Sequence, residues 1–175
     1  MLHNTGSIDT SGLTFVEPGY NGSFLIPSLG IIFTGPLTDI LQDFYNGFTG
    51  PTSFGIGGNF DPSSGSGDLV GLQCAGSGSG LRKPYLGVPS GYVSGSALSD
   101  TSTYDDATLS SLGVTPGTYV WTWGSGADAD SFTLNIGGTA TVPEPASLTL
   151  FGTAVLSFGA IQRRRRKDVR ALVPR

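Results

Sequence analysis

The sequence predicts a mainly β protein, with an antiparallel β-sandwich-like domain followed by a single C-terminal transmembrane helix. Two observations predict the domain. Short apolar stretches are separated throughout by Gly, Pro, Ser and Asp, and several of them alternate apolar and polar residues with the period of two that is typical of half-buried strands. One observation predicts the helix: residues 146–161 form an uncharged, proline-free and mostly apolar run.

Six short strands are expected in the first half of the chain, each bounded by glycine, proline or a polar turn residue. They are residues 12–16, 22–26, 30–34, 54–56, 69–72 and 85–88, and strand-like sequence already begins at residue 8. Two segments favour helical structure instead. Residues 36–45 place their apolar side chains on one helical face, and residues 105–112 favour one or two helical turns that end at Gly113.

The strongest local prediction is a β-hairpin at the end of the domain. Residues 117–123 alternate the aromatic residues Tyr119, Trp121 and Trp123 with smaller ones, and residues 131–136 alternate apolar with polar residues. The Gly- and Asp-rich segment between them forms turns readily. The aromatic stripe is a candidate glycan-stacking face if solvent reaches it, although large aromatics favour the core.

The C-terminal tail contains three blocks in order. The first is a proline-flanked acid, Pro143-Glu144-Pro145, in which the residue before each proline is held extended. The second is the run 146–161, about 24 Å long as a helix, which approaches the ~30 Å hydrocarbon core of a bilayer. The third is a basic cluster made of Arg163, Arg164, Arg165, Arg166 and Lys167.

The basic cluster predicts the topology of the chain. Lys and Arg beside a membrane span stay on the cytoplasmic side, so the domain is expected outside the cytoplasm, with the span in contact with membrane lipid. A buried core helix followed by a solvated run of charges is the alternative interpretation. The order of the three blocks argues against it.

Together the three blocks resemble the PEP-CTERM sorting signal of Gram-negative bacteria. The resemblance implies recognition of Pro143, Glu144 and Pro145 by an exosortase, transient anchoring in the inner membrane, cleavage near the motif, and delivery to the cell surface or extracellular matrix. Residues 109–136 also resemble the last two strands of the exported domain in many PEP-CTERM proteins. We therefore divide the chain into an exported all-β domain (1–138), a linker (139–142), the sorting signal (143–167) and a short cytoplasmic tail (168–175).

Charge and cysteine content narrow the range of partners. Residues 1–162 hold twelve acids and two bases, a formal net charge of −10, whereas residues 163–175 carry a net charge of +6. The acidic exported part argues against a nucleic-acid partner.

The lone Cys74 excludes an intrachain disulfide and is expected to be a buried thiol. Residues 1–6 lack the features of a signal peptide, so we expect the leader to be missing from this chain.

We expect no enzymatic activity, cofactor or metal. His3 is the only histidine, which leaves little basis for a Ser-His-Asp triad or a zinc site, and the Gly/Ser run 76–80 lacks the lysine of a P-loop. Aspartate pairs remain as candidate calcium ligands, although Asp also favours turns. These pairs are Asp105 with Asp106, Asp128 with Asp130, and Asp61 with Asp68.

Three hypotheses follow for function. The first is a non-enzymatic, exported protein of the cell envelope or extracellular matrix. The second is a carbohydrate-binding or adhesion module of the exopolysaccharide matrix, which requires an exposed face at Tyr119, Trp121 and Trp123. The third is a secreted hydrolase, which requires a pair of acids facing each other across a cleft.

Overall fold

The computed structural model describes residues 1–74 and 84–137. The chain divides into two units, Met1–Gly138 and Thr139–Arg175, and the fold described here is that of the first. Within the described residues its strands are β1 (Leu2–Ser7), β2 (Thr14–Asn21), β3 (Phe24–Ile26), β4 (Ile31–Thr34), β5 (Ile40–Asn46), β6 (Ser64–Gly67), β7 (Val70–Gln73), β8 (Tyr85–Pro89), β9 (Ala97–Thr103), β10 (Gly117–Trp123) and β11 (Asp130–Ile136). Two 3-10 turns accompany them, η1 (Pro27–Leu29) and η2 (Gly126–Asp128).

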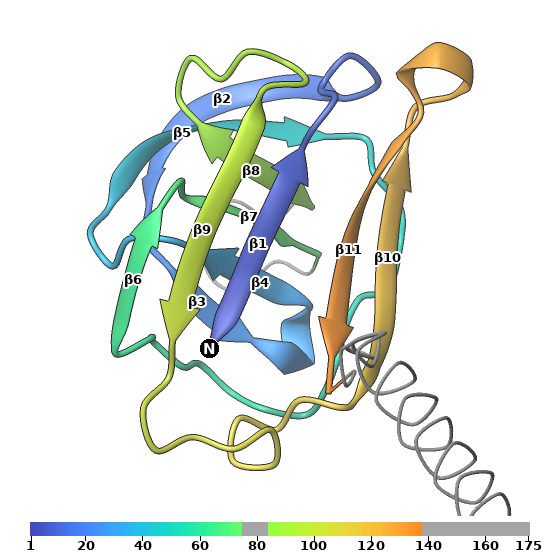
Figure 1. Ribbon diagram of the computed structural model, residues 1–175. Coiled ribbons are helices and arrows are strands. Elements are labelled where there is room, and N and C mark those ends of the chain that lie inside the picture. Colours follow the sequence, from blue (N-terminus) through green and yellow to red (C-terminus); the bar gives the residue numbers. More distant parts are fainter. Residues whose placement is uncertain (75–83, 138–175) are drawn as a thin grey trace, which may run out of the picture. The chain divides into compact units, whose positions relative to one another are not determined.

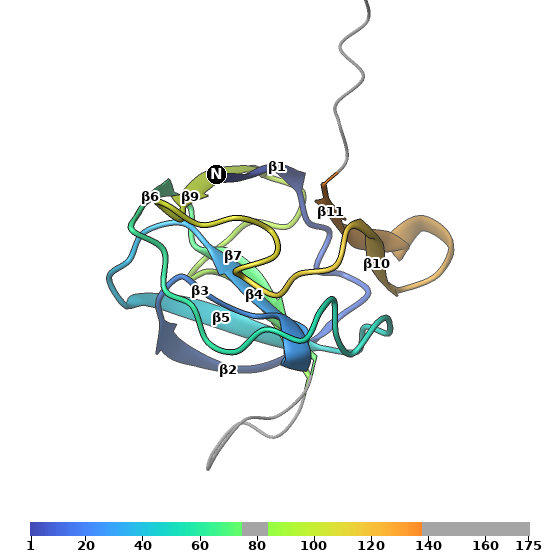
Figure 2. The same cartoon turned by 90° about the horizontal axis from the view of Figure 1, so that it is seen from below.

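The strands of the described residues form three antiparallel sheets. One has six strands in the order β2-β5-β8-β7-β4-β3, one has three in the order β1-β9-β6, and the hairpin β10-β11 is the third. Figures 1 and 2 show the three-stranded sheet facing the six-stranded sheet, with the hairpin beside β1. This arrangement confirms the prediction of a mainly β fold with antiparallel sheets.

All three sheets contribute to one hydrophobic core. Ile8 and Leu98 come from the three-stranded sheet and its continuation, Ile32 comes from the six-stranded sheet, and Trp121 and Leu134 come from the hairpin. Successive side chains of a strand point to opposite faces, and the four residues within strands lie on the inward side, whereas Ile8 directly follows β1. The sheets therefore stabilise one another by burying a shared apolar volume.

The other face of the six-stranded sheet carries a second, smaller cluster. Phe33 and Phe44 are buried there together with Ile31, Leu69 and Tyr85. The cross-strand pair Gly71 and Gly87 makes room for the aromatic rings. A Cβ atom on Gly71 would lie 2.7 Å from Cδ1 of Phe33, and one on Gly87 would lie 3.0 Å from Cε1 of both Phe33 and Phe44. Glycine is thus required here for close packing.

The predicted hairpin is confirmed. β10 and β11 pair in register from Gly117 opposite Ile136 to Trp123 opposite Asp130, and the turn between them contains η2. The predicted strands 22–26, 30–34, 69–72 and 85–88 correspond to β3, β4, β7 and β8, and the segment 12–16 leads into β2.

The helix predicted for residues 36–45 is wrong, because β5 occupies most of this segment. Gln42, a polar residue of this segment, is fully buried, and its Nε2 donates to the carbonyl oxygen of Leu69 at 2.7 Å. β5 lies between β2 and β8 in the sheet. Pairing on both sides therefore outweighs the helical pattern of the apolar residues.

Three smaller predictions are also corrected. Residues 105–112 form hydrogen-bonded turns rather than a helix, with Leu112 N donating to Thr108 O at 3.1 Å. Residues 54–56 are no strand, since only Gly55 makes an isolated bridge, to Val114. The strand-like sequence expected from residue 8 is not a strand at its start: β1 precedes it and ends at Ser7, and a turn follows before β2.

The predicted C-terminal transmembrane helix lies outside the described residues. Residues 1–74 and 84–137 contain no helix with the length and apolarity that crossing a membrane requires.

Candidate functional site

The aromatic stripe of β10 belongs to the core. Trp121 and Trp123 are 0 % and 4 % exposed, and their indole Nε1 atoms donate to the carbonyl oxygens of Pro51 and Asp9, both at 2.8 Å. Tyr119 is partly buried against the same cluster. Sugar rings stack on aromatic faces that solvent reaches, and the two tryptophans offer none. The stripe gives no support to a glycan site.

Two of the candidate calcium ligands, Asp68 and Asp130, hold backbone N–H groups through their carboxylates. Oδ2 of Asp68 accepts from the N–H of Ser99 at 2.9 Å, and both carboxylate oxygens of Asp130 accept from backbone N–H groups. Asp106 adopts a positive φ of 56°, as aspartate does in turns. Among the residues that the structure describes, no three His, Cys, Asp or Glu side chains gather as a metal site would require.

Cys74 is a partly buried free thiol next to the main core. Burial raises its pKa to about 11. A nucleophilic cysteine needs a lowered pKa, because the thiolate is the reactive form. The position therefore agrees with the expected structural thiol.

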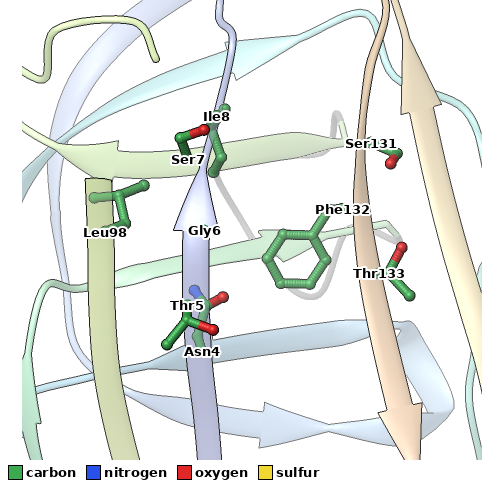
Figure 3. A pocket seen from close by; sticks show the side chains of 9 residues that line it. All are labelled: Asn4, Thr5, Gly6, Ser7, Ile8, Leu98, Ser131, Phe132 and Thr133. Atoms are coloured by element: carbon green, nitrogen blue, oxygen red, sulfur yellow. The ribbon is translucent and has the colours of Figure 1, made fainter. Parts of the chain in front are cut away.

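A slot lies between β1 of the three-stranded sheet and β11 of the hairpin. Its upper part has a volume of about 270 Å³, and a lower part of about 200 Å³ adjoins it through shared lining residues. Figure 3 shows the ring of Phe132 reaching from β11 toward β1 at the centre of the slot. The upper part is lined by Asn4, Thr5, Gly6, Ser7, Ile8, Leu98, Ser131, Phe132 and Thr133.

A buried carboxyl group lies behind the slot. Asp100 on β9 is 2 % exposed, and its Oδ2 accepts from Nδ2 of Asn4, a slot residue, at 3.1 Å. Desolvation raises the pKa of Asp100, with smaller opposing contributions from hydrogen bonds to Thr34 and Asn4. Asp100 thus positions Asn4 on the wall of the slot.

Sequence reasoning did not find this slot. Both of its walls come from strands that are mostly polar on the outside, and the β1 sequence LHNTGS has no strong strand pattern. The remaining predicted site residues, Pro143, Glu144 and Pro145 with the basic cluster 163–167, lie outside the described residues.

Comparison with protein families bears on that C-terminal region. Residues 141–166 match the family model of the PEP-CTERM protein-sorting motif. The chain carries a PEP-CTERM sorting signal. The chain matches neither a curated protein nor a solved structure in the comparisons made.

The PEP-CTERM motif implies an exported protein that is processed by exosortase, and it suggests a membrane-sorted or cell-surface destination. The match begins at Thr141 and ends at Arg166. It therefore includes two residues that we had assigned to the linker, and it ends one residue before Lys167. The motif concerns the fate of the chain and leaves the role of the β domain open.

Proposed function

We propose that this protein is exported to the cell envelope or extracellular matrix, with its β-sandwich-like domain as the delivered part. The ordered PEP-CTERM match at residues 141–166 carries the proposal. In this scheme residues 146–161 anchor the chain transiently in the inner membrane as a single span, with the domain outside. Exosortase then cleaves near Pro143-Glu144-Pro145, and the domain passes to the cell surface.

Each block of the signal has a physical role in this scheme. Val142 and Glu144 each precede a proline, which favours an extended backbone that a processing enzyme can grip, and Glu144 supplies one carboxylate at the outer boundary of the membrane. The uncharged run partitions into the bilayer. The side chains of Arg163 and its basic neighbours extend to the inner interface and hold that end in the cytoplasm.

We also propose that the β domain acts without catalysis. The sequence contains a single histidine, His3, which the structure places on the exposed side of β1. The carboxylates of Asp68 and Asp130, two of the candidate calcium ligands, accept hydrogen bonds from backbone N–H groups. A structural or interaction role in the envelope agrees with these observations better than a hydrolase does.

A pair of matched variants tests the sorting proposal. The chain contains two glutamates, and both precede a proline: Glu144 in the signal and Glu17 on the exposed edge strand β2. The full chain, supplied with a leader, is expressed in a Gram-negative host that has an exosortase, and its intact mass is measured. We expect the unmodified chain and Glu17→Ala to lose the C-terminal tail, and Glu144→Ala to retain it.

The opposite outcome is equally clear. If the unmodified chain keeps its complete C-terminus and fractionates with the cytosolic proteins, the proposed sorting route is wrong. If Glu144→Ala is processed as efficiently as the unmodified chain, the signal is used but the carboxylate has no part in its recognition.

A further inference from the structure

The backbone of β1 presents hydrogen-bonding groups to the slot. On β9 the backbone of Ser99 points toward β6, since its carbonyl oxygen accepts from Asp68 N at 3.0 Å and its N–H donates to the Asp68 carboxylate. Backbone groups of successive strand residues point to opposite sides. Thr5 of β1, the partner of Ser99, therefore turns its backbone away from β9 and into the slot. The same alternation applies to His3 and Ser7.

The backbone of β11 does the same from the opposite wall. Thr122 of β10 exchanges two backbone hydrogen bonds with Thr49, both 2.9 Å, on the side away from β11. Its partner Ser131 must then turn its backbone away from β10, toward the slot. Thr133 and Asn135 follow with the same period of two. Within the described residues, neither wall pairs with a strand on the slot side.

The two walls are too far apart to pair with each other. For most facing residues of β1 and β11 the Cα atoms are more than 8 Å apart, whereas paired antiparallel strands bring opposite Cα atoms to about 4.5–5.5 Å. One inserted strand would lie ~4.8 Å from each wall and would need walls ~9.6 Å apart. The separation of more than 8 Å is compatible with an inserted strand. Apart from the N–H of Ser131, which donates to Oδ1 of Asp130, the slot-facing backbone groups of both walls pair with no strand.

Side chains and charge restrict what can enter. The side chains that line the upper slot are uncharged, and Phe132 gives it an apolar floor. One end is closed by Asp9 and Asp130, whose backbone N–H and carboxylate are joined at 2.7 Å. A charged segment would lose hydration inside the slot without gaining a partner. Asp9 and Asp130 directly adjoin the lining residues Ile8 and Ser131, so a basic residue at the closed end would be attracted by two nearby carboxylates.

We propose that the slot binds an extended segment of another polypeptide as an added strand. The residues of that segment inside the slot are uncharged, and a basic residue at one end of it lies beside Asp9 and Asp130. Main-chain hydrogen bonds to both walls would supply the affinity, as in other cases of strand addition to a sheet edge. Along the bound segment, small apolar residues that face Phe132 alternate with small polar residues that face solvent. An added strand would join the three-stranded sheet to the hairpin.

Short synthetic peptides test this proposal on the full chain in detergent micelles. The probes are fluorescein-labelled KSVTVTS and SVTVTSK, which carry lysine at opposite ends because the direction of the strand is open, and their glutamate counterparts ESVTVTS and SVTVTSE. We expect one lysine peptide to bind and its glutamate counterpart to bind at least about threefold more weakly at low salt. A backbone N-methylated copy of the better peptide should lose binding.

Amide hydrogen exchange then locates the peptide. Binding should slow exchange in residues 2–7 and 131–136 and leave β2 and β6, which are also edge strands, unchanged. Equal protection of β2 or β6, or equal binding of the lysine, glutamate and N-methylated peptides, overturns the proposal. The proposal is also overturned if, without peptide, the slot becomes more protected from exchange as the protein concentration rises. A second copy of the chain would then be the occupant.

A pair of variants at Thr133 separates backbone from side-chain effects. Thr133→Pro removes an N–H that faces the slot and takes no part in the ladder with β10, so we expect peptide affinity to fall about fivefold. Thr133→Ala keeps the N–H and should bind as the unmodified chain does. Equal affinity in both variants contradicts strand addition. If Thr133→Pro fails to fold, the exchange experiment on the unmodified chain decides the question.

Discussion

The backbone N–H of Asp9 donates to Oδ2 of Asp130 at 2.7 Å, which links residues 121 positions apart in the sequence. Oδ1 of the same carboxylate accepts from the N–H of Ser131, also at 2.7 Å. The carbonyl oxygen of Asp9 accepts from Nε1 of Trp123 at 2.8 Å. These contacts join the end of β1 to the start of β11, so the two walls of the slot meet at one end although no ladder connects them.

We expect Asp130→Ala to lower the free energy of unfolding by about 1–2 kcal/mol, since two backbone donors lose a charged acceptor. Asp128→Ala is the matched control. Asp128 is exposed in η2, and its replacement should change stability by less than about 0.5 kcal/mol. Urea denaturation followed by tryptophan fluorescence measures both. Equal effects of the two substitutions would show that the contact between Asp9 and Asp130 does not stabilise the fold.

Trp121 and Val120 are neighbours on β10 with opposite environments. Trp121 is fully buried and packs edge-to-face against Phe54 and Phe132, whereas Val120 is 41 % exposed. Trp121→Ala should destabilise the domain by about 3–5 kcal/mol, and Val120→Ala by less than about 1 kcal/mol. Thermal or chemical denaturation checks this. A Trp121→Ala variant that folds with unchanged stability would contradict the assignment of the stripe to the core.

The hairpin could be predicted from the sequence because local signals and tertiary contacts agree there. In β10 the aromatic residues recur every second position, the spacing that a half-buried strand requires, and the structure buries Trp121 and Trp123 as that pattern implies. The segment after β10 is rich in Gly and Asp, and it forms the turn that returns the chain. In such a segment the strand propensity of the residues, the spacing of the apolar side chains and the turn-forming residues all favour the same structure.

Other elements were not predictable because tertiary contacts override weak local signals. β6 has the sequence SGSG and β9 has ALSDTST; neither contains the apolar alternation that marks a strand, and β9 is stabilised by its neighbours β1 and β6. Gln42 is buried through a hydrogen bond to Leu69, a partner 27 residues away that no local pattern reveals. The slot depends on the spatial order of strands far apart in the sequence.

The thiol of Cys74 should react slowly in the folded protein. Its pKa is raised to about 11 by burial, against roughly 8.5 for a free cysteine, so the thiolate fraction at pH 7.5 is lower by about two orders of magnitude. Modification by a disulfide reagent should be correspondingly slower than in urea-unfolded protein. Rapid labelling of the folded chain at pH 7.5 would contradict a structural role for this thiol.

Asp100 makes the stability of the domain depend on pH in a predictable direction. Its pKa is raised above the ordinary value by burial, so the unfolded state loses this proton first as the pH rises past about 3.9. Above that pH the folded state binds more protons at this site than the unfolded state does. The contribution of Asp100 to stability therefore falls with rising pH until the pH passes the folded-state pKa.

Asp100→Asn removes this titration and keeps an acceptor for Nδ2 of Asn4. We expect the variant to be more stable than the unmodified protein at pH 7, by an amount of the order of 1 kcal/mol, and equally stable at pH 3, where both states of Asp100 are protonated. The control Asp39→Asn, at an exposed position, should leave the stability at pH 7 nearly unchanged. Denaturation curves from pH 3 to 8 give the comparison. The contrary result would be a stability of Asp100→Asn, relative to the unmodified protein, that is lower at pH 7 than at pH 3. The ionised carboxylate would then stabilise the fold, because its bond to Asn4 would outweigh the cost of burying the charge.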